Sequence, residues 1–237
     1  PYNDFDDFGV SRSYGFKRQH LGHDMMGQVG TPVVAVESGY VEALGWNQYG
    51  GWRLGIRSFD HKRYYYYAHL RKNYPYQSGL EVGSVVQAGD VIGYLGRTGY
   101  SRTENTNNID DPHLHFGLEL IFDESQKDSN NEIWVSCYEL VKFLNLNRCE
   151  AVKVEGTKEW KRLYGIKDPL VPVQPATPSQ AGPAAESQAE SQAGPQTDPQ
   201  AGSQAEPQAG PQAESPPLLT LSPAAVLLSH HSHTAVL

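Results

Sequence analysis

The chain has 237 residues, of which 19 are basic and 27 are acidic, for a formal net charge of −8. This balance, with no stripe of basic residues, argues against a nucleic-acid partner, and no apolar run is long enough to span a bilayer. The chain begins at Pro1 without a signal-peptide pattern, so we expect a fragment or a trimmed form that hides any upstream signal or anchor.

Composition divides the chain into a folded part and a tail. From about Gln174 onward there is no Lys, Arg or aromatic residue, and small and polar residues dominate. Such a segment buries too little apolar surface to offset chain entropy. The expected organisation is a lead-in segment, a β core, a loop-and-helix closing segment and a disordered tail, over 1–13, 14–122, 123–170 and 171–237.

Short runs rich in Val, Ile and Tyr, separated by turns that contain Gly, predict strands in the first 122 residues. The expected strands are 32–36, 40–44, 52–57, 63–69, 91–95 and 115–121. This spacing favours a compact antiparallel β sandwich or barrel. The segment Gly30–Val34 is echoed within 83–93, which suggests two related β layers with the site between them.

The pattern changes after residue 122. Residues 123–132 are polar and predict a surface loop. A helix is expected from Ser136 as N-cap to about Leu144, and a short second helix near Lys158–Tyr164. At the other end of the chain, Asp4, Asp6 and Asp7 predict a solvated acidic segment.

Three short segments carry most of the histidines of the first 120 residues. They are His20-Leu21-Gly22-His23-Asp24, Tyr67-Ala68-His69-Leu70 and His113-Leu114-His115-Phe116. Imidazole and carboxylate are the ligands that zinc takes in hydrolytic sites, where three protein ligands leave one position open for water. The clustering predicts a catalytic zinc site.

Side-chain alternation along an extended chain sorts the first segment. His20, Gly22 and Asp24 share one face, and His23 lies opposite. Gly22 has no side chain and leaves room for a metal between two ligands. We therefore choose His20 and Asp24 as ligands and leave out His23, which is expected near the site or at the surface.

The same rule places His113 and His115 on one face, and His69 on a face with Tyr65 and Tyr67. The His-x-His pair supplies either two ligands or one ligand and one acid/base group. One member of the pair completes the three ligands. The other member and His69 are left to take the proton of the attacking water and deliver it to the leaving amine.

Together the segments resemble the lysostaphin-type (LytM-like) zinc metalloendopeptidases. The resemblance runs from about residue 14 to 121 and rests on His20-x-Gly22-x-Asp24, Gly30-Thr31-Pro32-Val33, Tyr67-Ala68-His69-Leu70, Gly89-Asp90-Val91-Ile92-Gly93 and Pro112-His113-Leu114-His115-Phe116. It implies a mainly β fold of the lysostaphin/LytM type. It also implies one Zn²⁺ per domain, held by His20, Asp24 and His115, with His113 and His69 as the pair that activates water.

The resemblance further implies hydrolysis of peptide bonds in bacterial peptidoglycan, in a cross-bridge or a stem peptide, outside the cytoplasm in the cell envelope or after secretion. The sequence departs from the family just before Pro112. Relatives usually have a short Gly/Ser/Thr-rich loop there, whereas Thr103–Asp111 is longer and contains three acids. We expect this loop at the edge of the cleft, and it leaves the cleaved bond open.

Two other functions compete with this hypothesis. A catalytically silent scaffold module of the cell envelope on the same fold often lacks a metal ligand, and none is missing here. A carrier domain for a phosphohistidine or a lipoyl or biotinyl lysine needs fewer groups than this set. The chain is expected to be a monomer, with Cys137 and Cys149 more readily free than bridged.

Overall fold

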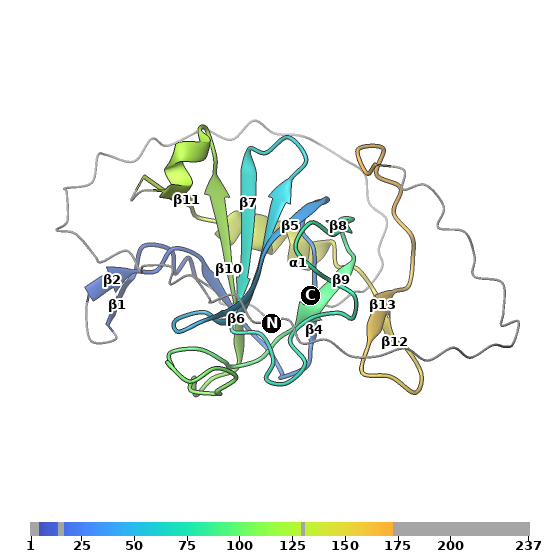
Figure 1. The fold of residues 1–237 in the computed structure, drawn as a ribbon, viewed down its shortest axis with the longest axis horizontal. Coiled ribbons are helices and arrows are strands. Elements are labelled where there is room, and N and C mark those ends of the chain that lie inside the picture. The colour runs from blue at the N-terminus through green and yellow to red at the C-terminus, as the bar shows by residue number, and fades with distance from the viewer. Residues whose placement is uncertain (1–4, 14–16, 129–130, 173–237) are drawn as a thin grey trace, which may run out of the picture. The chain divides into compact units, whose positions relative to one another are not determined.

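The computed structural model describes residues 5–13, 17–128 and 131–172 (Figure 1). A seven-stranded sheet with antiparallel pairing forms its main body. Its order is β11-β10-β7-β6-β5-β8, and β3 pairs with the first half of β10. The strands are β3 (His23–Met26), β5 (Gly39–Asn47), β6 (Gly51–Ser58), β7 (Arg63–Ala68), β8 (Val85–Val86), β10 (His113–Leu120) and β11 (Ile133–Val135).

Three smaller antiparallel pairs accompany the sheet. They are β1 (Ser11–Ser13) with β2 (Lys17–Gln19), β4 (Pro32–Val34) with β9 (Val91–Tyr94), and β12 (Ala151–Lys153) with β13 (Trp160–Arg162). One α-helix, α1 (Tyr138–Leu146), and one 3₁₀ helix, η1 (Glu124–Asp128), complete the described residues. The prediction of a mainly β antiparallel fold with a short helical segment is confirmed.

The main sheet has one face on the core and one face that carries the histidines. On β7, Tyr65 and Tyr67 are buried in the core, and the Tyr67 hydroxyl accepts a hydrogen bond from the Val36 amide at 3.0 Å. Alternation turns Tyr64 and Tyr66 to the other face. Helix α1 covers the core face, where Val141 is fully buried (Figure 1).

Several local predictions are wrong. Cys137, not Ser136, occupies the N-cap of α1. Residues 158–164 form no helix, because Trp160 packs into a small cluster with Tyr94 and the segment pairs as strand β13. The polar segment 123–132 contains η1, which is closed by the Gln126 side chain bonding to the Phe122 and Asp123 amides.

The expected position of the site between two β layers is also wrong. The echoed segments contribute β4, β8 and β9, and none of these strands carries a histidine of the three motifs. Those histidines gather on and beside the main sheet. Within the described residues, β11 and α1 extend the same body beyond residue 122, while the predicted domain boundaries stay predictions.

Cys137 and Cys149 are free thiols. The predicted tail lies outside the described residues from residue 173 onward. No helix in the described part of the chain has the length and apolar character needed to cross a bilayer.

Candidate metal centre

One donor atom from each of three side chains meets at a common point. Asp24 on β3 lies directly opposite His115 on β10 in the strand register, and His20 reaches in from the segment between β2 and β3. The His20 Nε2 atom is 3.0 Å from Asp24 Oδ1 and 2.9 Å from His115 Nδ1. The third edge of the triangle, from His115 Nδ1 to Asp24 Oδ1, is 3.0 Å.

This triangle suits a metal ion. A tetrahedral zinc ion with bonds of about 2.0–2.1 Å keeps its ligand atoms about 3.3 Å apart, close to the spacing observed. Two imidazole nitrogens and one carboxylate oxygen are also the donor types that zinc accepts in hydrolytic sites. The residues present therefore fit the metal that the sequence motifs imply, and they form a candidate metal site.

The charges of the metal-free centre follow from the same contacts. Burial disfavours the charged form of His20, but hydrogen bonds to Asp24 and Asp7 outweigh it and raise its pKa to about 9. Burial also opposes the charge on Asp24, yet hydrogen bonds from His115 and His20 hold its pKa far below the usual range. Burial lowers the pKa of His115. A metal cation bound between these side chains therefore replaces the proton that His20 otherwise carries beside Asp24.

Asp7 contacts the ligands on the side away from the metal site, and the prediction that it is solvated is wrong, although Asp6 is exposed as predicted. Asp4 lies outside the described residues. The Asp7 side chain is 1% exposed. Its Oδ1 contacts His23 Nδ1 at 2.6 Å, its Oδ2 accepts the Asp24 amide at 3.2 Å, and its carbonyl lies 2.9 Å from His20 Nδ1. Since a carbonyl only accepts, His20 carries its proton on Nδ1 in the neutral ring and turns a bare Nε2 to the centre.

These contacts show what the sequence pattern missed. His23, opposite the ligands as alternation predicts, is fully buried and serves as a partner of Asp7. Arg12 of β1 donates to Asp24 Oδ2 at 3.0 Å, which leaves Oδ1 facing the other two ligands. No local signal distinguishes Asp7 from its acidic neighbours, because its burial depends on packing against residues 13 to 17 positions away.

We expect Asp7→Asn to weaken zinc binding about 10- to 100-fold, the usual cost of losing a partner behind a ligand. The amide keeps the shape but lacks the charge that orients His23 and the Asp24 amide. Competition with a chromophoric chelator measures the affinity. Asp6→Asn is the matched control, since exposed Asp6 contacts Ser136 and the Phe8 amide rather than a ligand. Equal affinities for the two variants would contradict the assignment.

Gly22 makes room for a ligand rather than for the metal itself. A Cβ atom at this position would lie 2.7 Å from His115 Cε1 and 2.7 Å from the Phe116 carbonyl oxygen. We expect Gly22→Ala to lower the free energy of unfolding by about 1–3 kcal/mol, the usual cost of overpacking. Thermal or urea unfolding measures the loss. Gly165→Ala, where a Cβ meets nothing within 4 Å, should be close to neutral.

His113 and His69 flank the triangle with a shared arrangement. Each ring has its Nδ1 against a backbone carbonyl, that of Asp111 at 2.7 Å and that of Thr98 at 2.9 Å, respectively. The ring centroids of the two histidines are 4.8 Å apart. The carbonyls fix Nδ1 as the protonated nitrogen of each neutral ring, so both Nε2 atoms remain available as proton acceptors.

His69 reaches this position against the alternation of its strand. The prediction that it shares a face with Tyr65 and Tyr67 is wrong, because His69 has a φ of 62° and turns away from their core face. Its amide donates to the Gly50 carbonyl at 2.8 Å, which helps to hold this conformation. Burial, followed by the nearby charges of His113 and His115, keeps the pKa of His69 well below its usual range.

The long loop before β10 lies beside His69. Tyr100, with a φ of 48°, places its ring 5.7 Å from that of His69. Further along the loop, Asn105 Oδ1 accepts hydrogen bonds from Trp52 Nε1 at 2.9 Å and the Asn73 amide at 2.8 Å. The loop is thus tied to the sheet at the rim of the metal centre.

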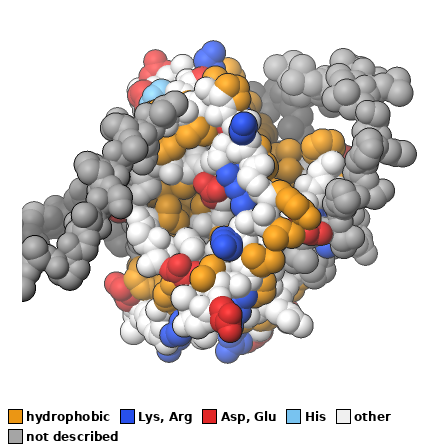
Figure 2. All heavy atoms as spheres, turned by 90° about the vertical axis from the view of Figure 1, so that its right-hand side faces the viewer, with side chains coloured by type: hydrophobic (Ala, Val, Ile, Leu, Met, Phe, Trp, Pro, Cys, Tyr) orange, Lys and Arg blue, Asp and Glu red, His pale blue; other side chains and the backbone are white. Residues whose placement is uncertain are grey.

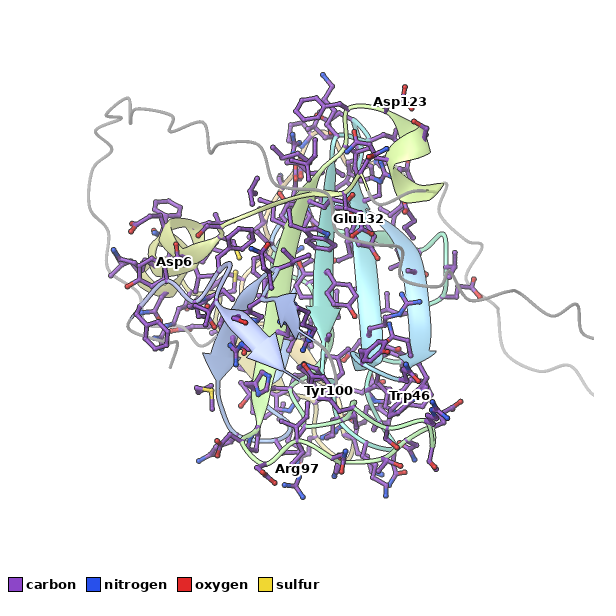
Figure 3. The ribbon with its side chains drawn as sticks, turned by 90° about the vertical axis from the view of Figure 1, so that its left-hand side faces the viewer. Asp6, Trp46, Arg97, Tyr100, Asp123 and Glu132 are labelled. Carbon is purple, nitrogen blue, oxygen red and sulfur yellow. The ribbon has the colours of Figure 1, made fainter. Side chains whose placement is uncertain are left out.

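The figures place this rim on one side of the molecule. In Figure 3, Tyr100 and Arg97 lie at the same end of the main sheet, and Glu132 and Asp123 lie toward the other end. On the opposite side, shown in Figure 2, histidine is visible only at the upper edge.

Comparison with known proteins accords with this geometry. Residues 18–129, which include all five of these histidine and aspartate side chains, match the model of peptidase family M23. The chain belongs to this family. The M23 segment is 39% identical over 111 residues to an L-Ala–D-Glu endopeptidase of Bacillus subtilis, which covers 47% of this chain and 32% of that protein.

Two further M23 relatives are lysostaphins. The lysostaphin of Staphylococcus staphylolyticus is 39% identical over 98 residues, 41% of this chain and 18% of that protein. The solved catalytic domain of lysostaphin from Staphylococcus simulans is 31% identical, with 60% of this chain and 92% of that domain covered and a TM-score of 0.45. The chain spans about a third or less of the length of these curated relatives.

Proposed function

We propose that the chain is a zinc-dependent endopeptidase that hydrolyses peptide bonds in bacterial peptidoglycan. The observation that carries the proposal is the triangle of His20, Asp24 and His115, with edges of 2.9–3.0 Å, flanked by two further histidines. Membership of peptidase family M23 and similarity to an L-Ala–D-Glu endopeptidase support the reaction class. Membership of the family also supports a place of action in the cell wall.

In this proposal His20, Asp24 and His115 hold the metal through the three atoms that face one another. Zinc, when bound, polarises a peptide carbonyl and lowers the pKa of a water molecule. His69 and His113 act on the proton. Their Nε2 atoms are bare in the neutral rings, so one accepts the proton of the attacking water and the pair returns it to the departing amine.

The environment of His69 keeps its ring neutral near pH 7. Burial and the adjacent histidines depress its pKa, so the ring is neutral and can accept a proton at that pH. His113 is more accessible, with 13% of its side chain exposed, and stands closer to the ligand carboxylate, its Nε2 3.8 Å from Asp24 Oδ1. A proton on either ring also stabilises negative charge that develops on the carbonyl oxygen.

The test is a digest of purified peptidoglycan from several cross-bridge types, with products identified by mass spectrometry. We expect new amino termini, their loss with a chelator, and their return with stoichiometric zinc. Zinc content of the purified protein is measured in parallel. Stoichiometric zinc without any released peptide would favour the alternative, a silent scaffold module of the cell envelope. Sedimentation of the same sample tests the expected monomer.

A further inference from the structure

The hairpin of β1 and β2 brings two positive charges to the metal centre. Arg12 and Arg18 are directly opposite each other in its register. Like charges in such a pair destabilise a ladder unless each finds an opposite charge. Arg12 has two opposite charges beside it, because its guanidinium lies 3.0 Å from the Asp24 carboxylate and 3.4 Å from that of Asp7.

Arg18 has no such partner among the residues that the structure describes. Within the described part of the chain, no carboxylate lies within salt-bridge distance of its guanidinium. Its terminal nitrogen donates to the Tyr100 hydroxyl, and its guanidinium carbon lies 5.2 Å from the centroid of the Tyr100 ring. Its Nε atom is buried and has no hydrogen-bond partner among the described residues. A partly buried guanidinium with unpaired N–H donors is stabilised when an anion binds to it.

The position of Arg18 connects it to the reaction site on two sides. Its contact Tyr100 has a ring 5.7 Å from that of His69, and its cross-strand neighbour Arg12 touches the ligand Asp24. Figure 3 shows the hairpin in front of the main sheet, beside Tyr100. Arg18 is thus one contact away from His69 through Tyr100 and one strand neighbour away from the ligand Asp24 through Arg12.

We propose that Arg18, together with the Tyr100 hydroxyl, binds a carboxylate of the peptide substrate next to the cleaved bond. The guanidinium can donate two parallel N–H hydrogen bonds to a carboxylate. A peptide without a charged side chain or terminus has no group that accepts both bonds with an opposite charge. The inference rests on the proposed peptidase function and narrows it. The substrate class is acidic peptides, such as stem peptides with a free carboxylate, rather than uncharged glycine bridges.

The experiment uses three fluorogenic peptides that differ only around the cleaved bond, with a Glu, a Gln or only Gly residues there. The full chain, loaded with zinc, is expected to cleave the Glu peptide about 10- to 100-fold more efficiently than the Gln peptide, the range for a hydrogen bond to a charged group. Arg18→Gln should remove this preference mainly by raising KM for the Glu peptide. Arg18→Lys should restore part of it.

Matched controls separate this role from general charge effects and from folding. Arg102→Gln removes an exposed arginine from the same loop as Tyr100 and should keep the preference. Tyr100→Phe, which removes only the hydroxyl, should reduce the preference by a smaller factor and serves as the second variant if Arg18→Gln fails to fold.

A binding measurement makes the outcome independent of turnover. Calorimetry of the Glu and Gln peptides with the metal-free protein should show tighter binding of the Glu peptide, and Arg18→Gln should abolish the difference. Equal cleavage and equal binding of the two peptides by the unmodified chain would overturn the inference and leave the peptidase function standing. Cleavage of none of the peptides, with charge-selective binding intact, would instead count against the peptidase function.

Discussion

Replacing His115 with Ala is expected to remove stoichiometric zinc and to lower peptide cleavage roughly 10³-fold or more, since a bound metal contributes several kcal/mol to the stabilisation of developing charge. The His115 Nδ1 atom supplies one corner of the ligand triangle, 2.9 Å from His20 Nε2 and 3.0 Å from Asp24 Oδ1. With that corner removed, the two remaining donors hold zinc weakly. Elemental analysis of the purified variant and a muropeptide assay measure the two effects.

The matched control is His61→Ala, because His61 is an exposed histidine in the turn between β6 and β7. It should keep full zinc content and full cleavage. Circular dichroism and thermal unfolding of both variants show whether the sheet remains folded, since His115 also pairs with Asp24 and Ala68 through its backbone, which the substitution leaves in place. Undiminished cleavage by His115→Ala would refute the assignment of the metal site.

His69→Gln should show the opposite combination, with zinc retained and kcat lowered about 10²- to 10⁴-fold, the usual contribution of a general acid or base. The glutamine side chain fills much of the same space and stays polar, but its amide cannot accept the proton that the ring accepts at Nε2. His113→Gln is expected to behave in the same way because its ring repeats the arrangement at the Asp111 carbonyl. Loss of zinc from either variant would identify that residue as a ligand instead.

The pH profile provides a second measure of His69. Its pKa is depressed by burial and by the adjacent histidines, so protonation inactivates the base only below the usual histidine value of about 6.5. We expect the acidic limb of kcat to lie below that pH and to be absent from the residual activity of His69→Gln. An acidic limb unchanged in His69→Gln would assign that limb to another group.

The local pattern of the sequence determined the larger part of the fold and of the centre. Strand alternation predicted that His113 and His115 share a face and that Tyr65 and Tyr67 share a face, because successive side chains of a strand must point to opposite sides. The structure shows that the face of Tyr65 and Tyr67 is the one buried in the core. The mainly β antiparallel fold and membership of the lysostaphin-like family also followed from sequence motifs and are confirmed. The division of the histidines into ligands and proton carriers remains a proposal.

Tertiary structure decided what no local pattern encodes. His69 turns toward the centre because its backbone adopts a left-handed conformation. Hydrogen bonds to the Gly50 and Thr98 carbonyls help to hold it there. Asp7 becomes an anchor only because the chain buries it against His20 and His23. Such contacts join residues that are distant in sequence or that break the alternation of a strand. Their energies depend on tertiary packing rather than on the types of the neighbouring residues. The sequence alone therefore identified the chemical groups of the centre, while the fold determined which of them meet.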